Sequence, residues 1–265
     1  MKFAVAGKGG VGKTFVSATL ARLLARDGYN VLAVDADSNI NLASSLGIDR
    51  EVAEKIVPLA DNEALIQEKT GVAPGRSFGS MFRMAPTVGD IVDKFGVVGP
   101  DGVKLLVMGT VKAGDSGCMC PANALLRVLI QHLLIQRRDV VIMDMEAGLE
   151  HLGRGTARRV DAMLVVVEPR MKSVDTINRI MDLAREIEVR EVLAVGNKIA
   201  GERERLFVEE RMRDAGIPVV TYIPYDPAVA EADMLGEAPL DRDGNSPAVK
   251  AVTALKESLR LRYGF

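Results

Sequence analysis

The chain has 265 residues, of which 48% are hydrophobic and 26% are charged, a composition typical of a globular protein with a sizeable core. Its formal net charge is −2, so bulk attraction to nucleic acid or to an anionic membrane is not expected. No run approaches the roughly 18 consecutive apolar residues of a membrane helix. Two cysteines and a strand pattern that starts at residue 2 leave no sign of a leader, which predicts a cytoplasmic protein.

Short apolar runs alternate with helical patterns along the chain. We expect strands at 2–6, 30–37, 103–109, 139–145, 162–169, 191–198 and 219–224. Apolar residues at helical spacing predict helices between them, for example at 13–28 and 173–189. This alternation indicates a single α/β domain, 1–265, with a mostly parallel sheet and helices on both faces. Residues 50–102, rich in glycine and proline, are expected to form an irregular insertion at the sheet edge or over the site.

A phosphate-binding motif follows the first strand and opens the first helix. Residues 7–14 read GKGGVGKT, which matches G-x-x-x-x-G-K-[ST]. In such a loop backbone N–H groups surround phosphate oxygens, so we expect Lys13 to reach the β- and γ-phosphates of ATP and Thr14 to hold Mg²⁺. A glycine-rich turn with a chance lysine is the alternative. The predicted nucleotide-binding residues here are Gly7, Lys8, Gly9, Gly10, Val11, Gly12, Lys13, Thr14 and Phe15.

A second lysine, Lys8, follows the first glycine of the motif. The stretch KGGVGKT resembles the deviant Walker A family of P-loop NTPases, which includes nitrogenase iron protein and the Min and Par ATPases. The resemblance implies a face-to-face dimer in which Lys8 is catalytic, reaching the partner's nucleotide and stabilising charge on the transferred phosphoryl group. A solvated loop lysine is the alternative.

Aspartates stand at two strand ends, where parallel sheets place their chemistry. In VLAVDADSN, Asp37 matches the family's catalytic switch aspartate, which orients the attacking water, while Asp35 is expected to support the local fold or the magnesium shell. In VVIMDMEAG, Asp144 is expected to hold a magnesium-bound water. Capping of the next element is the alternative. The resemblance also implies adenine contacts from Asn197 in VGNKI and Pro224 in YIPYDP.

The two cysteines, Cys118 and Cys120, are separated by one methionine. A bridge between them would close a strained ring, and two sulfurs are too few for a tetrahedral metal site. Pro121 suits the first position of a helix, which places Cys120 near an N-cap where the helix field favours the metal-binding thiolate. Soft sulfur ligands select zinc, nickel, copper(I) or an iron–sulfur cluster, and two chains would bring four sulfurs together, which predicts a metal site shared between them. Ordinary small residues in a turn are the alternative.

The stretches CMCPAN and DMEAGLEHLGRG, together with the phosphate loop, resemble the carbon monoxide dehydrogenase nickel-insertion ATPases of the CooC type. The resemblance implies a homodimeric, ATP-hydrolysing metallochaperone whose client is carbon monoxide dehydrogenase or the related acetyl-CoA synthase. It also implies that the metal at Cys118 and Cys120, shared between the two chains, is Ni²⁺ or Zn²⁺. The chain departs from the family pattern at Phe15, where Thr or Ser is frequent, and at Ser38, where Pro is frequent. Of the two histidines, His132 falls on an apolar helical face, and His151 is the better candidate for signalling between nucleotide and metal.

Two other functions stay open. A Min- or Par-type positioning or partitioning ATPase would bind membrane or DNA, and the C-terminal VTALKESLRLRYGF is amphipathic, although a closing helix docked on the domain is the expectation. An iron–sulfur ATP-dependent reductase like nitrogenase iron protein has cluster cysteines far apart in sequence, unlike the adjacent pair here. We therefore expect no nucleic-acid partner and no stable membrane association.

Overall fold

The computed structural model describes residues 1–37, 40–72, 83–109, 121–136, 140–145, 160–186 and 189–265. The predicted metal ligands Cys118 and Cys120 lie outside these ranges, as do Ser38 and His151.

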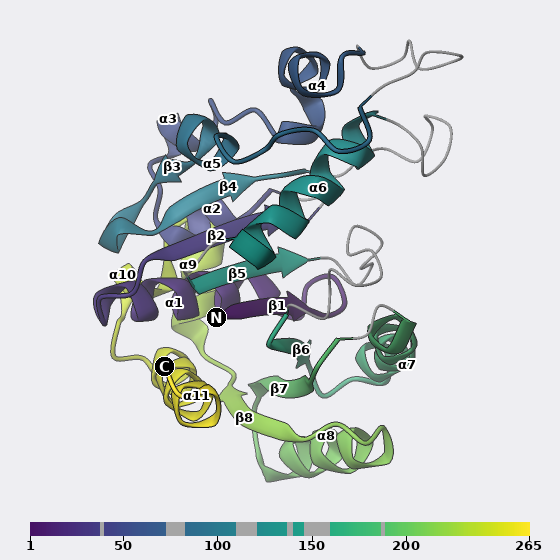
Figure 1. Cartoon of the computed structure of the whole chain (residues 1–265). Helices are drawn as coiled ribbons and strands as arrows, with labels where there is room; N and C mark the ends of the chain where they lie inside the picture. Colours follow the sequence, from purple (N-terminus) through teal and green to yellow (C-terminus); the bar gives the residue numbers. More distant parts are fainter. Residues whose placement is uncertain (38–39, 73–82, 110–120, 137–139, 146–159, 187–188) are drawn as a thin grey trace.

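A single sheet of eight strands runs through the described part of the chain, in the order β3-β4-β2-β5-β1-β6-β7-β8 (Figure 1). The strands are β1 Lys2–Ala6, β2 Val31–Ala36, β3 Val97–Val98, β4 Lys104–Val107, β5 Val140–Met145, β6 Ala162–Val167, β7 Val192–Ile199 and β8 Val219–Pro224. All neighbours pair in parallel except β3, which is antiparallel to β4. The seven predicted strands and the mostly parallel α/β sheet are confirmed.

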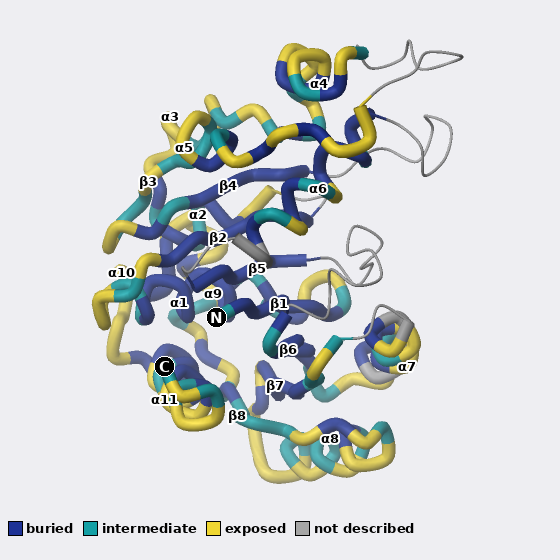
Figure 2. The backbone as a smooth tube through the Cα atoms, viewed as in Figure 1, coloured by how far each residue is buried: buried dark blue, intermediate teal, exposed yellow. Residues whose placement is uncertain are grey.

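Helices cover both faces of this sheet. They are α1 Lys13–Arg26, α2 Leu42–Leu46, α3 Arg50–Ala53, α4 Glu63–Thr70, α5 Ile91–Phe95, α6 Pro121–Gln136, α7 Met171–Glu186, α8 Glu202–Asp214, α9 Pro227–Leu235, α10 Pro239–Arg242 and α11 Pro247–Tyr263, with 3₁₀ turns η1 Leu59–Asp61 and η2 Pro100–Gly102. One core cluster joins the sheet to α4, α6, α7 and α8, and a second joins it to α1, α2 and α11. The inner strands β1, β2, β5 and β6 are therefore buried along their length, whereas the edge strands β3 and β8 are partly exposed (Figure 2).

The described part of 50–102 is more regular than its glycine and proline content suggested. It forms α3, η1, α4, α5 and the short β3, which pairs with β4 at the outer edge of the sheet. Leu65, Ile66 and Ile91 are almost fully buried in the cluster that also contains residues of α6. The glycines and prolines here separate short elements. The apolar residues of η1, α4 and α5 still pack into one core cluster together with α6.

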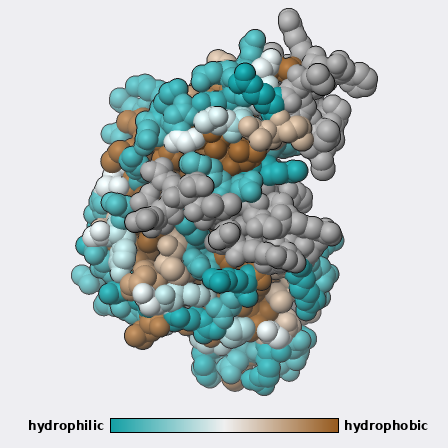
Figure 3. Space-filling view, in the orientation of Figure 1, coloured by the Kyte–Doolittle hydropathy of each residue, from teal (hydrophilic) through white to brown (hydrophobic). Residues whose placement is uncertain are grey.

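The C-terminal helix α11 packs against α1 and β8. Leu255 and Leu259 are buried, and the Phe265 ring lies 6.0 Å from the Phe3 ring and 5.6 Å from the Tyr29 ring. The expectation of a closing helix docked on the domain is confirmed. The helices that the structure describes include none long and apolar enough to cross a membrane. On the face seen in Figure 3, hydrophobic residues lie in small groups between hydrophilic ones.

Candidate nucleotide site

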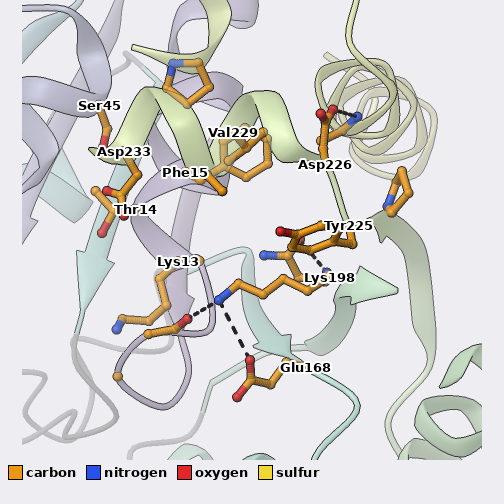
Figure 4. Close-up of a pocket in the computed structure, with 18 of the residues that line it drawn as sticks. Lys13, Thr14, Phe15, Ser45, Glu168, Lys198, Tyr225, Asp226, Val229 and Asp233 are labelled. Carbon is orange, nitrogen blue, oxygen red and sulfur yellow. Dashed lines mark hydrogen bonds and ion pairs between the residues drawn. The ribbon is translucent and has the colours of Figure 1, made fainter. Parts of the chain in front are cut away.

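The strand order brings the sequence motifs to one edge of the sheet. Strand β1, which leads into the phosphate loop, lies between β5 and β6, and β2 is the next strand beyond β5. Asp35 on β2 is the register partner of Asp144 on β5. A cavity of about 650 Å³ opens at this edge, with Lys13, Thr14 and residues of α9 around it (Figure 4).

The phosphate loop needs glycine at two points because neighbouring strands approach it closely. A Cβ at Gly7 would lie 2.5 Å from the carbonyl oxygen of Val166, and a Cβ at Gly12 would lie 2.3 Å from Nδ2 of Asn197. Both glycines also have positive φ, 152° and 95°. Gly12 is the N-cap of α1, so the loop curves directly into the helix N-terminus, the form that favours an anion.

Lys13 and Asp37 form an ion pair inside the cavity. The Lys13 ammonium lies 3.3 Å from Oδ2 of Asp37, and both residues are buried. Asp35 holds the turn that carries Asp37, because its carboxylate accepts hydrogen bonds from the backbone N–H groups of Asp37 at 3.2 Å and Leu42 at 3.1 Å. Of the two roles expected for Asp35, support of the local fold is the one these bonds describe.

Asp144 lies beside the first turn of α1. Its Oδ1 accepts a hydrogen bond from the Ser17 hydroxyl at 3.2 Å, and the Thr14 hydroxyl also bonds to this carboxylate. Burial raises the pKa of Asp144 to about 6, although the Thr14 bond and the Lys13 charge oppose the shift. Sequence reasoning missed Ser17, yet it stands three residues after Thr14 on one helical face, a spacing that could have indicated it.

The oxygen atoms of Thr14 and Asp144, at the first turn of α1, form a corner of the site that fits magnesium. Thr14 offers a hydroxyl and Asp144 a carboxylate, the hard oxygen ligands that Mg²⁺ prefers. Burial and the Asp144 charge raise the pKa of Asp35 to about 7, so the corner stabilises added positive charge. A bound divalent cation would supply it.

The predicted adenine contacts line the same cavity. Asn197, Pro224, Tyr225 and Lys198 contribute to its wall, together with the phosphate loop. The Asn197 side chain already makes two bonds, because Nδ2 donates to the Val11 carbonyl at 2.8 Å and Oδ1 accepts from the Lys198 backbone N–H at 2.9 Å. The other cavity residues that sequence reasoning missed include Glu168, Arg170, Glu204, Asp233 and Glu237.

Some predicted residues are not brought into the cavity. Lys8 is half-buried on the loop but does not line the cavity of its own chain. His132 is half-buried on α6, with its ring near Gly89. Within the described ranges, no group of three or more His, Cys, Asp or Glu side chains is arranged to hold a metal ion by itself.

Comparison with known proteins identifies the family. Residues 2–240 match the CobQ/CobB/MinD/ParA nucleotide binding domain. The chain is 42% identical over 247 residues to an uncharacterized ATP-binding protein of Methanocaldococcus jannaschii, with 93% of each chain covered. It is 39% identical over 265 residues to the carbon monoxide dehydrogenase accessory protein CooC of Rhodospirillum rubrum, covering 100% of this chain and 98% of that protein.

Solved structures agree on the fold. The septum site-determining protein MinD of Pyrococcus horikoshii, complexed with Mg-ADP, superposes with a TM-score of 0.68 at 21% identity, covering 99% of this chain and 97% of that one. A ParA family ATPase from Chlorobium tepidum gives a TM-score of 0.70 at 18% identity, covering 97% and 98%. The resemblance to the CooC type is confirmed, and the chain belongs to the CobQ/CobB/MinD/ParA nucleotide-binding family.

Proposed function

We propose that this chain is an ATP-hydrolysing, nucleotide-switched homodimeric metallochaperone that delivers nickel to carbon monoxide dehydrogenase or the related acetyl-CoA synthase. One observation carries the proposal: in a chain 39% identical end to end to CooC, Lys13 and Asp37 line a cavity that Asn197 and Pro224 also border, and the Asp144 carboxylate interacts with both charges from behind the first turn of α1.

The Lys13–Asp37 pair suggests how ATP prepares its own hydrolysis. A γ-phosphate in the loop competes with Asp37 for the Lys13 ammonium, so binding frees the Asp37 carboxylate to accept a hydrogen bond from the attacking water. The water attacks the γ-phosphorus, and the bond from that phosphorus to the β–γ bridging oxygen breaks, giving ADP and phosphate. Mg²⁺ held by Thr14 and Asp144 would neutralise phosphate charge.

The metal cargo is assigned to the cysteine pair. Cys118 and Cys120 from each of two chains would supply four thiolates, while Lys8 would reach the partner's nucleotide across the same dimer seam. Nucleotide contacts that change the separation of the two chains would then change the spacing of the sulfurs, which couples ATP to metal affinity.

The packing of α11 supports this function over a membrane-positioning ATPase. The apolar face of α11 contacts α1 and β8, and its Lys256 ammonium pairs with Asp27 at 2.5 Å. Using this face to bind a bilayer would require undocking the helix and exposing that part of the core.

A transfer assay tests the proposal. Nickel-free carbon monoxide dehydrogenase is incubated with the nickel-loaded protein and either ATP or ADP, and the recovered carbon monoxide oxidation is measured. We expect ATP-dependent recovery with the natural chain and with the control Lys55→Ala. Lys55 is an exposed lysine just after α3 that does not line the cavity. Lys13→Ala and the double change Cys118→Ser, Cys120→Ser should both fail. Equal recovery without ATP, or with the cysteine variant, would contradict the proposal.

A further inference from the structure

Two consecutive residues at the end of β7 contact two consecutive carbonyls of the phosphate loop. The Lys198 ammonium donates to the Gly10 carbonyl at 2.6 Å, and Nδ2 of Asn197 donates to the Val11 carbonyl at 2.8 Å. These partners are 188 and 186 residues apart in the chain. Figure 4 shows the Lys198 side chain reaching along the cavity to the loop.

These bonds fix the direction of peptide groups. In a trans peptide the C=O and the following N–H point in opposite directions. A Gly10 carbonyl held toward β7 therefore turns the Val11 N–H to the other side of the loop, where it faces the Lys8 carbonyl at 3.4 Å. The Val11 carbonyl does the same for the Gly12 N–H. Fixing the direction of these two peptide groups holds the curvature of the loop, whose remaining backbone N–H groups are available to an anion.

The backbone of Lys198 has a conformation that non-glycine residues rarely adopt. Its φ is 59°, in the left-handed region, and its N–H is bonded to Oδ1 of Asn197. This geometry brings the Lys198 side chain back toward the loop rather than along the strand. Oε2 of Glu168 lies 3.8 Å from the same ammonium and helps to hold it there.

We propose that Lys198 is a positioning residue of the nucleotide site: through the Gly10 carbonyl it holds the phosphate loop in its anion-binding form before nucleotide arrives. Asn197 is the second anchor of this clamp. The proposal rests on the nucleotide-binding function proposed above. A loop that is already shaped loses less conformational freedom on binding, so the clamp contributes to affinity rather than to the chemical step.

The experiment is an equilibrium titration of the natural chain and its variants with ADP and Mg²⁺, followed by calorimetry. Lys198→Ala removes a charge-assisted hydrogen bond and should raise the Kd by about tenfold. Lys198→Gly removes the same ammonium but accepts the φ of 59° more readily, so it separates loss of the bond from backbone effects. Lys198→Arg keeps a donor and should restore most of the affinity, and Lys55→Ala should match the natural chain.

The outcomes separate a clamp from a merely structural residue. In steady-state hydrolysis, Lys198→Ala should raise KM about tenfold with kcat changed less than about twofold, and the melting temperature without nucleotide should stay close to that of the natural chain. An unchanged Kd, a loss that arginine does not restore, or a fall in kcat alone would overturn the proposal. Because binding of ADP with Mg²⁺ needs neither hydrolysis nor the nickel or zinc cargo, normal clamp results with failed nickel transfer would overturn the proposed function alone.

Discussion

The ion pair between Lys13 and Asp37 links two residues with different predicted roles. Lys13 is expected to hold phosphate in the ground state and the transition state, whereas Asp37 is expected to act on water. We predict that Lys13→Ala abolishes binding of ADP and ATP, because no other phosphate-loop side chain offers its buried charge among the described cavity residues. Binding is measured by calorimetry.

Lys8→Ala should leave the ADP affinity nearly unchanged and slow hydrolysis. The expected loss in kcat reaches about 10³-fold or more, because that is the contribution of an arginine finger, the role proposed for Lys8. The contrast between the two lysines is the control for this prediction. Normal turnover by the Lys8 variant would remove its trans-acting role.

Asp37→Asn should retain ATP binding and lose turnover. An amide keeps the size of the carboxylate but is a poor acceptor for the proton of the attacking water, so the loss falls on kcat. Single-turnover hydrolysis measures the step directly, and light scattering measures the dimer, which should accumulate with ATP. Unchanged hydrolysis would transfer the role to another group, Asp35 first.

Asp35 should make stability depend on pH in the nucleotide- and metal-free protein. Its folded pKa of about 7 lies above the unfolded value of 3.8, so the folded state binds the extra proton between these values. The free energy of unfolding should therefore fall as pH rises from about 4 to about 7, by at most about 1.4 kcal/mol per pH unit from this group. Urea unfolding at several pH values measures it, and the slope should be shallower in Asp35→Asn. Parallel curves for the two proteins would contradict the assignment.

Residues in contiguous motifs could be predicted from the sequence, and residues that depend on tertiary contacts could not. Lys13, Thr14 and Asp144 each follow from a short pattern tied to a strand or helix end. Ser17 and Lys198 stand next to residues of such patterns, but their contacts with Asp144 and Gly10 could not be predicted, because they join segments 127 and 188 residues apart in the chain.

At the scale of elements, the buried strands were predictable because near-continuous apolar runs are required when both faces of a sheet are covered. The two-residue β3 and the short helices of 50–102 were not, because elements this short carry too few residues to show a period. Their place is decided by burial of residues such as Leu65 against a surface formed by distant parts of the chain.

Arg22 joins three elements and should matter for stability. Its guanidinium on α1 is buried and bonds to both carboxylate oxygens of Asp241 on α10, at 2.6 and 2.7 Å, and to Asp101 in η2 at 2.6 Å. We predict that Asp241→Asn lowers the free energy of unfolding by about 1–3 kcal/mol, because it weakens a charge-assisted bidentate contact to a buried cation.

Urea unfolding measures this loss, with Asp182→Asn as the matched control. Asp182 pairs with Arg185 at 3.4 Å, but both side chains are at least 70% exposed, so the control should change stability by less than about 0.5 kcal/mol. A loss no larger in Asp241→Asn than in the control would contradict the role given to Arg22.

At the scale of the whole molecule, the sheet places the nucleotide cavity at the carboxyl ends of its strands, and α11 covers α1 and β8 and contributes Ala248 to the cavity wall. The cysteine pair directly precedes α6, whose apolar residues belong to the main core. The proposed metal site is therefore tied through a helix to the sheet that carries Asp144. Such a connection would let a change at the nucleotide reach the metal.

Metal analysis of the purified protein, without nucleotide and with ATP, tests the central claim most directly. Because each chain offers two thiols, we predict about one nickel or zinc ion per two chains, a changed affinity with ATP, and loss of tight binding but not of ATP binding in Cys118→Ser or Cys120→Ser. An anaerobic absorption spectrum of the same sample should show metal–thiolate charge transfer. One ion per chain, an iron–sulfur spectrum, or full binding after both cysteines are replaced would contradict the account.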